Sequence, residues 1–174
     1  MILGAVIGTL IGLAASYGGI SGSEGLIGIE KKVEQKKYHD YTIGDKVNLA
    51  GISYQVTKVT TQKSQIFEKA AGKYIVVYMT IENLRNVPVN VIEGQFGIID
   101  DKGRLFTTAS NYYSLEGEVL YNVVVQPNLP IDRRMAFDVP FDENLGYKLI
   151  IVVDPSDEHG EKAIIKLGMG RDFS

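Results

Sequence analysis

The chain has 174 residues, of which 45% are hydrophobic, with a formal net charge of −3 and no cysteine. This length and composition can build one domain with a substantial core together with a leading segment. The negative charge argues against binding to a nucleic-acid backbone, and a chain without cysteine has no disulfide, thiolate metal site, cysteine nucleophile or lipid-bearing cysteine.

The first predicted element is an apolar N-terminal helix at residues 1–23, where no charged side chain precedes Glu24. A helix of roughly 20 residues can cross a hydrocarbon layer of about 30 Å. Gly4, Gly8 and Gly12 repeat at every fourth position and would form a smooth ridge for the close approach of another helix. The segment is interpreted as a membrane anchor or as an assembly segment that packs against neighbouring subunits. A signal peptide with small residues at 14–16 is a third interpretation, although no basic residue precedes its apolar core.

Residues 24–40 form a charged connector. Four lysines in this connector follow the apolar stretch, and the positive-inside rule would then place the following domain in the cytoplasm. Large domains can be translocated despite such charges, so the membrane side stays open. The connector is interpreted as a solvated stalk, with a patch for lipid headgroups as the alternative.

Residues 41–174 predict an antiparallel β-sandwich, because short apolar runs alternate with turn residues. The run at 74–83 has apolar side chains on both faces and predicts a central strand, as does the run at 147–153. Val59 breaks the alternation of the run at 52–61, which predicts a bulge nearby. The polar stretch QKSQIFEKAAG is expected to form a loop or one helical turn, and LRNVPVN a turn. The remaining predicted strands are 46–49, 95–100, 104–108, 121–125, 131–139 and 163–167.

No motif predicts catalysis or a nucleotide site. The two histidines, His39 and His159, are far apart in the sequence, and neither a G-x-S-x-G turn nor a phosphate-binding glycine loop is present. The protein is therefore expected not to be an enzyme and to need no cofactor.

Two groups of residues are candidate binding sites. The acidic stretch DPSDEHGE could offer oxygen ligands to Ca²⁺ or could be a solvated loop; its carboxylates are Asp154, Asp157, Glu158 and Glu161. Three tyrosines flank the stretch SLEGEVL, and on loops at one end of a sandwich they would be contact residues unless they pack in the core. These are Tyr112, Tyr113 and Tyr121.

The order of six segments carries a resemblance that covers Tyr41 to Leu167. They are YTIGDKV, GISYQVTKV, GKYIVVYMTIEN, FGIIDDKGRLF, MAFDVP and YKLII. This order resembles the telokin-like, immunoglobulin-fold domain of unknown function found in bacterial and archaeal surface proteins. The resemblance implies an immunoglobulin-like sandwich behind a membrane anchor or lipoprotein leader, and it carries over no catalytic residue. The chain departs from the lipoprotein form because it has no cysteine.

Two functions follow as hypotheses. The first is a non-catalytic, membrane-anchored extracytoplasmic module at the cell surface, whose loops bind a protein or a cell-envelope component. The second is a structural subunit of a surface filament, a homo-oligomer in which the apolar N-terminus packs against neighbouring subunits and an open sheet edge accepts a strand. Neither hypothesis involves nucleic acid.

Overall fold

The computed structural model describes residues 40–64, 69–109, 117–157 and 160–173, all within one compact unit, Lys36–Ser174. The predicted N-terminal helix at 1–23, with Gly4, Gly8 and Gly12, lies outside the described residues, as does nearly all of the connector at 24–40. Among the residues described, no helix is long and apolar enough to cross a membrane.

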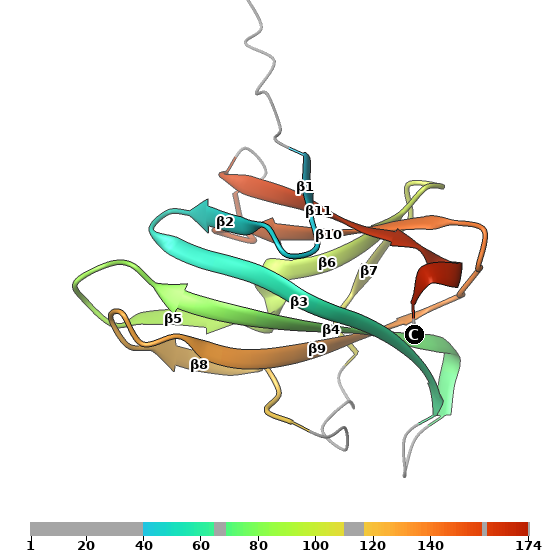
Figure 1. The fold of residues 1–174 in the computed structure, drawn as a ribbon, viewed down its shortest axis with the longest axis horizontal. Helices are drawn as coiled ribbons and strands as arrows, with labels where there is room; N and C mark the ends of the chain where they lie inside the picture. The colour runs from blue at the N-terminus through green and yellow to red at the C-terminus, as the bar shows by residue number, and fades with distance from the viewer. Residues whose placement is uncertain (1–39, 65–68, 110–116, 158–159, 174) are drawn as a thin grey trace, which may run out of the picture. The chain divides into compact units, whose positions relative to one another are not determined.

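The unit is a β-sandwich, as predicted (Figure 1). One sheet has the order β1-β11-β10-β6-β7 and the other has the order β2-β3-β4-β9, while β5 and β8 form a separate two-stranded ribbon. The strands of the first sheet are β1 (Asp40–Thr42), β11 (Lys162–Met169), β10 (Gly146–Val152), β6 (Phe96–Asp100) and β7 (Leu105–Thr107). Those of the second are β2 (Lys46–Leu49), β3 (Ile52–Ser64), β4 (Lys69–Asn83) and β9 (Ile131–Val139). The ribbon strands are β5 (Val89–Ile92) and β8 (Asn122–Val125).

The central strands are those with apolar side chains on both faces. β4 lies between β3 and β9, and β10 lies between β11 and β6, so both predictions are confirmed. Along β4, Ile75 and Val77 point into the main core between the sheets, whereas Tyr74 and Val76 point to a smaller cluster on the opposite face. Each fully buried aliphatic side chain of this kind contributes about 1.5–3 kcal/mol.

The predicted bulge near Val59 is also confirmed. The β3–β4 register shifts between Val56 and Lys58, and this shift returns Val59 to the core face. The hairpin between β6 and β7 turns at Gly103, whose φ of 77° is a conformation that glycine adopts readily.

Two sequence predictions are wrong. The polar stretch after Thr61 does not form a loop throughout, because β3 continues to Ser64 and β4 begins at Lys69, with residues 65–68 outside the described part. The predicted turn LRNVPVN contains the start of strand β5, which runs from Val89 and pairs antiparallel with β8. In both cases tertiary hydrogen bonding overrides weak local strand propensity.

Residues 117–120, which precede β8, lie along the edge of β9 that faces away from β4. The amide of Leu120 donates to the Arg134 carbonyl (2.9 Å), and the amide of Arg134 donates to the Glu118 carbonyl (3.0 Å). The Arg134 side chain is buried (1% exposed), and its Nε and Nη2 donate to the Gly117 carbonyl at 3.2 and 3.0 Å. This edge of the sheet is therefore covered by the protein's own chain, which is a common way to prevent association between sheets.

Candidate functional site

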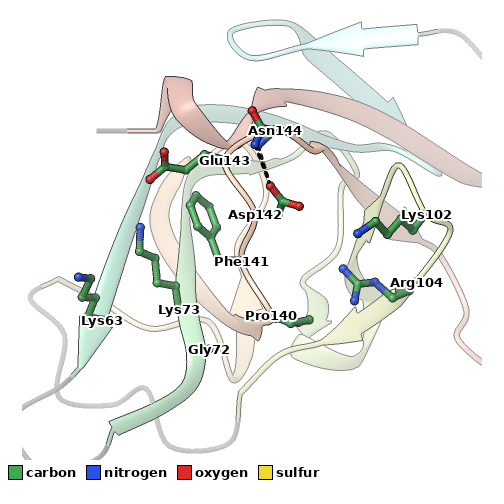
Figure 2. Close-up of a pocket in the computed structure, with 10 residues that line it drawn as sticks. All are labelled: Lys63, Gly72, Lys73, Lys102, Arg104, Pro140, Phe141, Asp142, Glu143 and Asn144. Atoms are coloured by element: carbon green, nitrogen blue, oxygen red, sulfur yellow. Dashed lines mark hydrogen bonds between the residues drawn. The ribbon is translucent and has the colours of Figure 1, made fainter.

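A cleft of about 880 Å³ lies at the end of the sandwich where β3 ends and the β6–β7 and β9–β10 connections meet (Figure 2). Its lining residues come from separate parts of the chain and are Lys63, Gly72, Lys73, Lys102, Arg104, Pro140, Phe141, Asp142, Glu143 and Asn144. The lining therefore contains four basic side chains and two carboxylates. We refer to it as the basic cleft.

One wall of the basic cleft is the start of β4, which lies directly against the end of β9. The Asp138 carboxylate accepts hydrogen bonds from the amides of Ala71 (2.8 Å) and Gly72 (3.0 Å). A Cβ atom at Gly72 would overlap the Val139 carbonyl, so only glycine allows the two strands to approach this closely. This approach places Lys73 beside Phe141.

The aromatic ring of Phe141 lines the basic cleft and packs against two further rings. Phe141 stacks parallel to the buried Tyr147, with ring centroids 5.8 Å apart, and Phe173 packs against both rings. The Lys73 ammonium lies 4.2 Å from the centre of the Phe141 ring. A cation held over an aromatic face is attracted by the ring quadrupole, which keeps this ammonium at the cleft.

The β9–β10 connection is fixed from two sides. The Asp142 amide donates to the Tyr147 hydroxyl (2.9 Å), and the Asp142 carboxylate accepts from the Asn144 amide (3.0 Å). The C-terminal 3₁₀ turn η3 (Gly170–Asp172) packs on the other side, where the Gly170 amide donates to the Leu145 carbonyl (2.9 Å). The loop that carries Phe141 and two carboxylates is therefore a positioned part of the cleft.

The opposite wall is the β6–β7 hairpin. The buried Asp100 carboxylate accepts from the backbone amides of Lys102 and Arg104, both at 3.0 Å, and from Nε and Nη2 of Arg104, both at 2.7 Å. Burial alone would raise the pKa of Asp100, but the hydrogen bonds and charge of Arg104 outweigh it and lower the pKa below its usual value. Asp101, the next residue of the turn, accepts from the Gly146 amide (2.7 Å).

Three of the four cations have no carboxylate partner among the residues that the structure describes. Arg104 pairs with Asp100, whereas no described carboxylate lies within 4.0 Å of the ammonium of Lys63, Lys73 or Lys102. Figure 2 shows Lys63 and Lys73 on one side of Phe141 and Asp142, with Lys102 and Arg104 on the other. The lining has more positive than negative charges although the whole chain carries −3, so the cleft can attract an anionic group.

Of the residues that the sequence singled out, none that the structure describes lines this cleft. Tyr121 is 56% exposed and precedes β8, away from the basic cleft, while Tyr112 and Tyr113 lie outside the described residues. Tyr121 as a contact residue therefore stays a prediction, as do the other two.

The acidic loop gives no metal site among the residues that the structure describes. The Asp154 carboxylate accepts from the amide (2.8 Å) and hydroxyl (2.6 Å) of Ser156, which is the local bonding of a turn. Asp157 and Glu161 are exposed, and Glu158 lies outside the described part. No three described acidic or histidine side chains gather closely enough to hold a metal ion.

Little in the sequence pointed to the basic cleft, because its cations come from the end of β3, the start of β4 and the β6–β7 turn. The available signal was that basic residues gather where two predicted hairpins could turn toward the same end. Without the register of β3 and β4, that proximity could not be deduced.

Comparison with known proteins identifies a family match. The family model DUF4352, described as a domain of unknown function, matches residues 41–164. No curated protein matches the chain. Neither the family description nor the names of the similar structures below indicates a catalytic activity.

Solved structures are similar in fold at low sequence identity. The yjhA protein from Bacillus subtilis aligns with a TM-score of 0.58 and 13% identity, over 73% of this chain and 98% of that one. The "putative lipoprotein (ycdA)" from Bacillus subtilis subsp. subtilis str. 168 aligns with a TM-score of 0.57 and 14% identity, over 75% of this chain and 39% of that one. The secreted protein MPT63 from Mycobacterium tuberculosis aligns with a TM-score of 0.56 and 10% identity, over 76% and 98%. At these identities the likeness shows the fold.

Proposed function

We propose that this chain, which belongs to the DUF4352 family of domains of unknown function, is a non-catalytic extracytoplasmic module that binds an anionic component of the cell envelope. The observation that carries the proposal is the basic cleft, in which Lys63, Lys73 and Lys102 have no carboxylate partner among the described residues. Ammonium groups in a concave site suit phosphate or carboxylate groups on a larger molecule.

The location at the cell surface rests on two supports. The names of similar structures describe a secreted protein and a lipoprotein, and this chain has an apolar segment at residues 1–23. We propose that this segment anchors the module in the membrane, with residues 24–40 as the stalk. The immunoglobulin-like, telokin-like subtype of the sandwich is part of the same proposal, supported by two packed, largely antiparallel sheets over one core.

One observation favours the filament subunit as a second candidate. β2 pairs with β3 only through Ile52–Gln55, so on the side away from β4 the rest of β3 has no partner strand among the described elements. Such an edge can accept a strand from another subunit. A bulge near Thr57 and the exposed side chains of Lys58 and Lys63 oppose this pairing, because they are typical protections of a free edge. Sedimentation of detergent-extracted native protein as high polymers would favour the filament.

The binding proposal is tested with full-length protein in detergent. Its affinity is measured by calorimetric titration with polyglycerol phosphate, a phosphate polymer, and with polygalacturonate, a carboxylate polymer. The test variant is Lys63→Gln/Lys73→Gln/Lys102→Gln. The matched control is Lys46→Gln/Lys58→Gln/Lys166→Gln, which removes the same charge from exposed positions outside the cleft.

We expect the cleft variant to bind between about threefold and 150-fold more weakly than the control, because exposed charge pairs contribute about 0.2–1 kcal/mol each and three are removed. The polymer that binds more tightly identifies phosphate or carboxylate as the preferred group. Equal loss in both variants would show a general charge effect and would overturn the cleft as the site, as would the absence of binding to either polymer.

A further inference from the structure

The ribbon of β5 and β8 exposes an unusual amount of apolar surface. Of the eight large hydrophobic side chains exposed among the described residues, six lie on this ribbon or on the chain next to it. They are Leu84, Val87, Ile92, Tyr121, Val124 and Leu129, which we call the ribbon face. The ribbon and the basic cleft lie at different ends of the unit (Figure 1). Exposed apolar side chains gathered in this way commonly mark an interaction site.

The ribbon face is nearly free of charge. The segments 84–92 and 121–130 contain one charged residue, Arg85, although 22% of the chain is charged. The Arg85 Nε donates to the Ala50 carbonyl (2.6 Å), which directs this charge toward the β2–β3 turn. Depletion of charged residues is typical of the centre of a protein–protein interface. A lipid surface would instead be expected to have several lysines or arginines against it.

The face is backed by a fixed scaffold. Val91 and Val125 are fully buried in the main core beneath it. Asn83, also fully buried, donates through Nδ2 to the carbonyls of Val87 (2.8 Å) and Val125 (2.9 Å) and accepts through Oδ1 from the Arg85 amide (2.9 Å). One side chain thus joins the loop before β5 to the end of β8, so the apolar groups are presented in one arrangement.

The outward residues of the ribbon alternate between apolar and amide side chains. Asn90 pairs across the strands with Val124, and Ile92 pairs with Asn122, and all four are exposed. An amide both donates and accepts, so an asparagine can bond to another asparagine without a net charge. A face with this alternation is complementary to itself when a two-fold axis brings apolar groups against apolar groups and amides against amides.

We propose that the ribbon face is a homodimer interface, occupied by the ribbon face of a second copy of this chain. Two copies of this face bring uncharged surfaces together, so no like charges oppose the contact. The inference does not depend on the binding function of the cleft. It also differs from assembly through the N-terminal segment, because the residues involved belong to the sandwich.

The first test uses the absence of cysteine from the chain. In full-length protein in detergent, Val124→Cys introduces a single thiol on the ribbon face. Leu105→Cys places one at an equally exposed site on β7 and is the matched control, since the two side chains are 58% and 62% exposed. We expect mild oxidation to convert most of the Val124→Cys protein to a disulfide-linked dimer while the control stays mainly monomeric. Equal cross-linking of the two variants, or none in Val124→Cys, would overturn the proposal.

The second test is sedimentation equilibrium of the full-length protein and of Val124→Lys and Leu105→Lys. Both variants keep the N-terminal segment, so association through that segment affects them equally. We expect the dissociation constant to rise at least tenfold in Val124→Lys only. A monomeric wild type, or identical behaviour of the two variants, would overturn the interface. Binding of the wild type but not Val124→Lys to phosphatidylcholine vesicles, without dimerisation, would assign the face to lipid instead.

Discussion

The basic cleft and the ribbon face are built on one sandwich core but differ in what holds them and in the charge they present. At the cleft, carboxylates hold the backbone in place, because Asp138, Asp100 and Asp101 each accept hydrogen bonds from backbone amides. Three lysine side chains line the cleft that these segments form. At the ribbon, one neutral residue, Asn83, fixes two segments, and the surface is apolar. The comparison suggests that a single rigid fold supports two different kinds of contact, one electrostatic and one hydrophobic.

The largest effect is expected where both regions depend on the same residue. Val77 is fully buried in the central strand β4, between Val59 and Met135. Val77→Asp should lower the free energy of unfolding by more than about 4 kcal/mol, because it buries an unpaired charge. Thermal unfolding followed by circular dichroism checks this. Leu105→Asp also introduces a carboxylate, at a side chain that is 62% exposed and lies outside the ribbon face, and should melt close to wild type. A cooperative wild-type-like melt for Val77→Asp would contradict the strand assignment.

The next prediction concerns a change that should disturb the ribbon face and leave the basic cleft intact. Asn83→Ala should cost about 2–3 kcal/mol, because it leaves the carbonyls of Val87 and Val125 without their donor in a buried site. Dimerisation should weaken with it, while polymer binding at the cleft should persist. Urea unfolding and sedimentation give the two readouts. Asn86→Ala, in the same loop but exposed, is the control and should change neither. Equal stability of the two variants would show that Asn83 does not hold the ribbon.

A substitution at Gly72 should have the opposite pattern, disturbing the basic cleft and leaving the ribbon face intact. Gly72→Ala places a methyl group against the Val139 carbonyl, so the start of β4 must move away from β9. We expect a loss of about 1–3 kcal/mol, as for other overpacked sites, with weaker polymer binding and unchanged dimerisation. Gly94→Ala is the matched control, since a Cβ there meets no atom within 4 Å. Should Gly72→Ala bind polymer as the control does, the close approach of the two strands is not needed for the cleft.

The smallest effect is a dependence on pH that is confined to the cleft side. The pKa of Asp100 is lowered in the folded protein, so its ionised form stabilises the fold above its ordinary pKa of about 4. This contribution is lost as the pH falls through the lowered value. In acid titrations monitored by NMR, lowering the pH should therefore shift the amide signals of Lys102 and Arg104 at a higher pH than the amide signals of β5 and β8. In Asp100→Asn this early transition should disappear. A transition that affects both regions together would contradict their independence.

The sequence predicted the parts of the fold that depend on local alternation. β4 and β10 were recognisable because apolar residues occupy both faces. β5 was missed because Pro88 and two asparagines outweigh its three valine and isoleucine residues, although pairing with β8 and the buried Asn83 stabilise it. The extension of the β3–β4 hairpin was missed because its stabilising partner, Asp138, is more than 60 residues away.

The sites were less predictable than the fold. Tyr121 was selected as an exposed aromatic and does lie on the ribbon face, but its apolar neighbours come from two other segments. The cleft depends on which strands turn toward the same end, and no spacing in the sequence records that. Local residue types therefore indicated candidate contacts, whereas their grouping depended on strand register.

The most direct test of the proposed function is the salt dependence of polyglycerol phosphate binding by the full-length protein. If the lysines of the cleft attract the polymer, the affinity of the wild type should fall as salt rises, because screening weakens exposed charge interactions. The triple variant at Lys63, Lys73 and Lys102 should bind more weakly at low salt and respond less to added salt, while the control triple variant should behave as the wild type does. Identical affinities and salt dependence in the two triple variants would contradict the account.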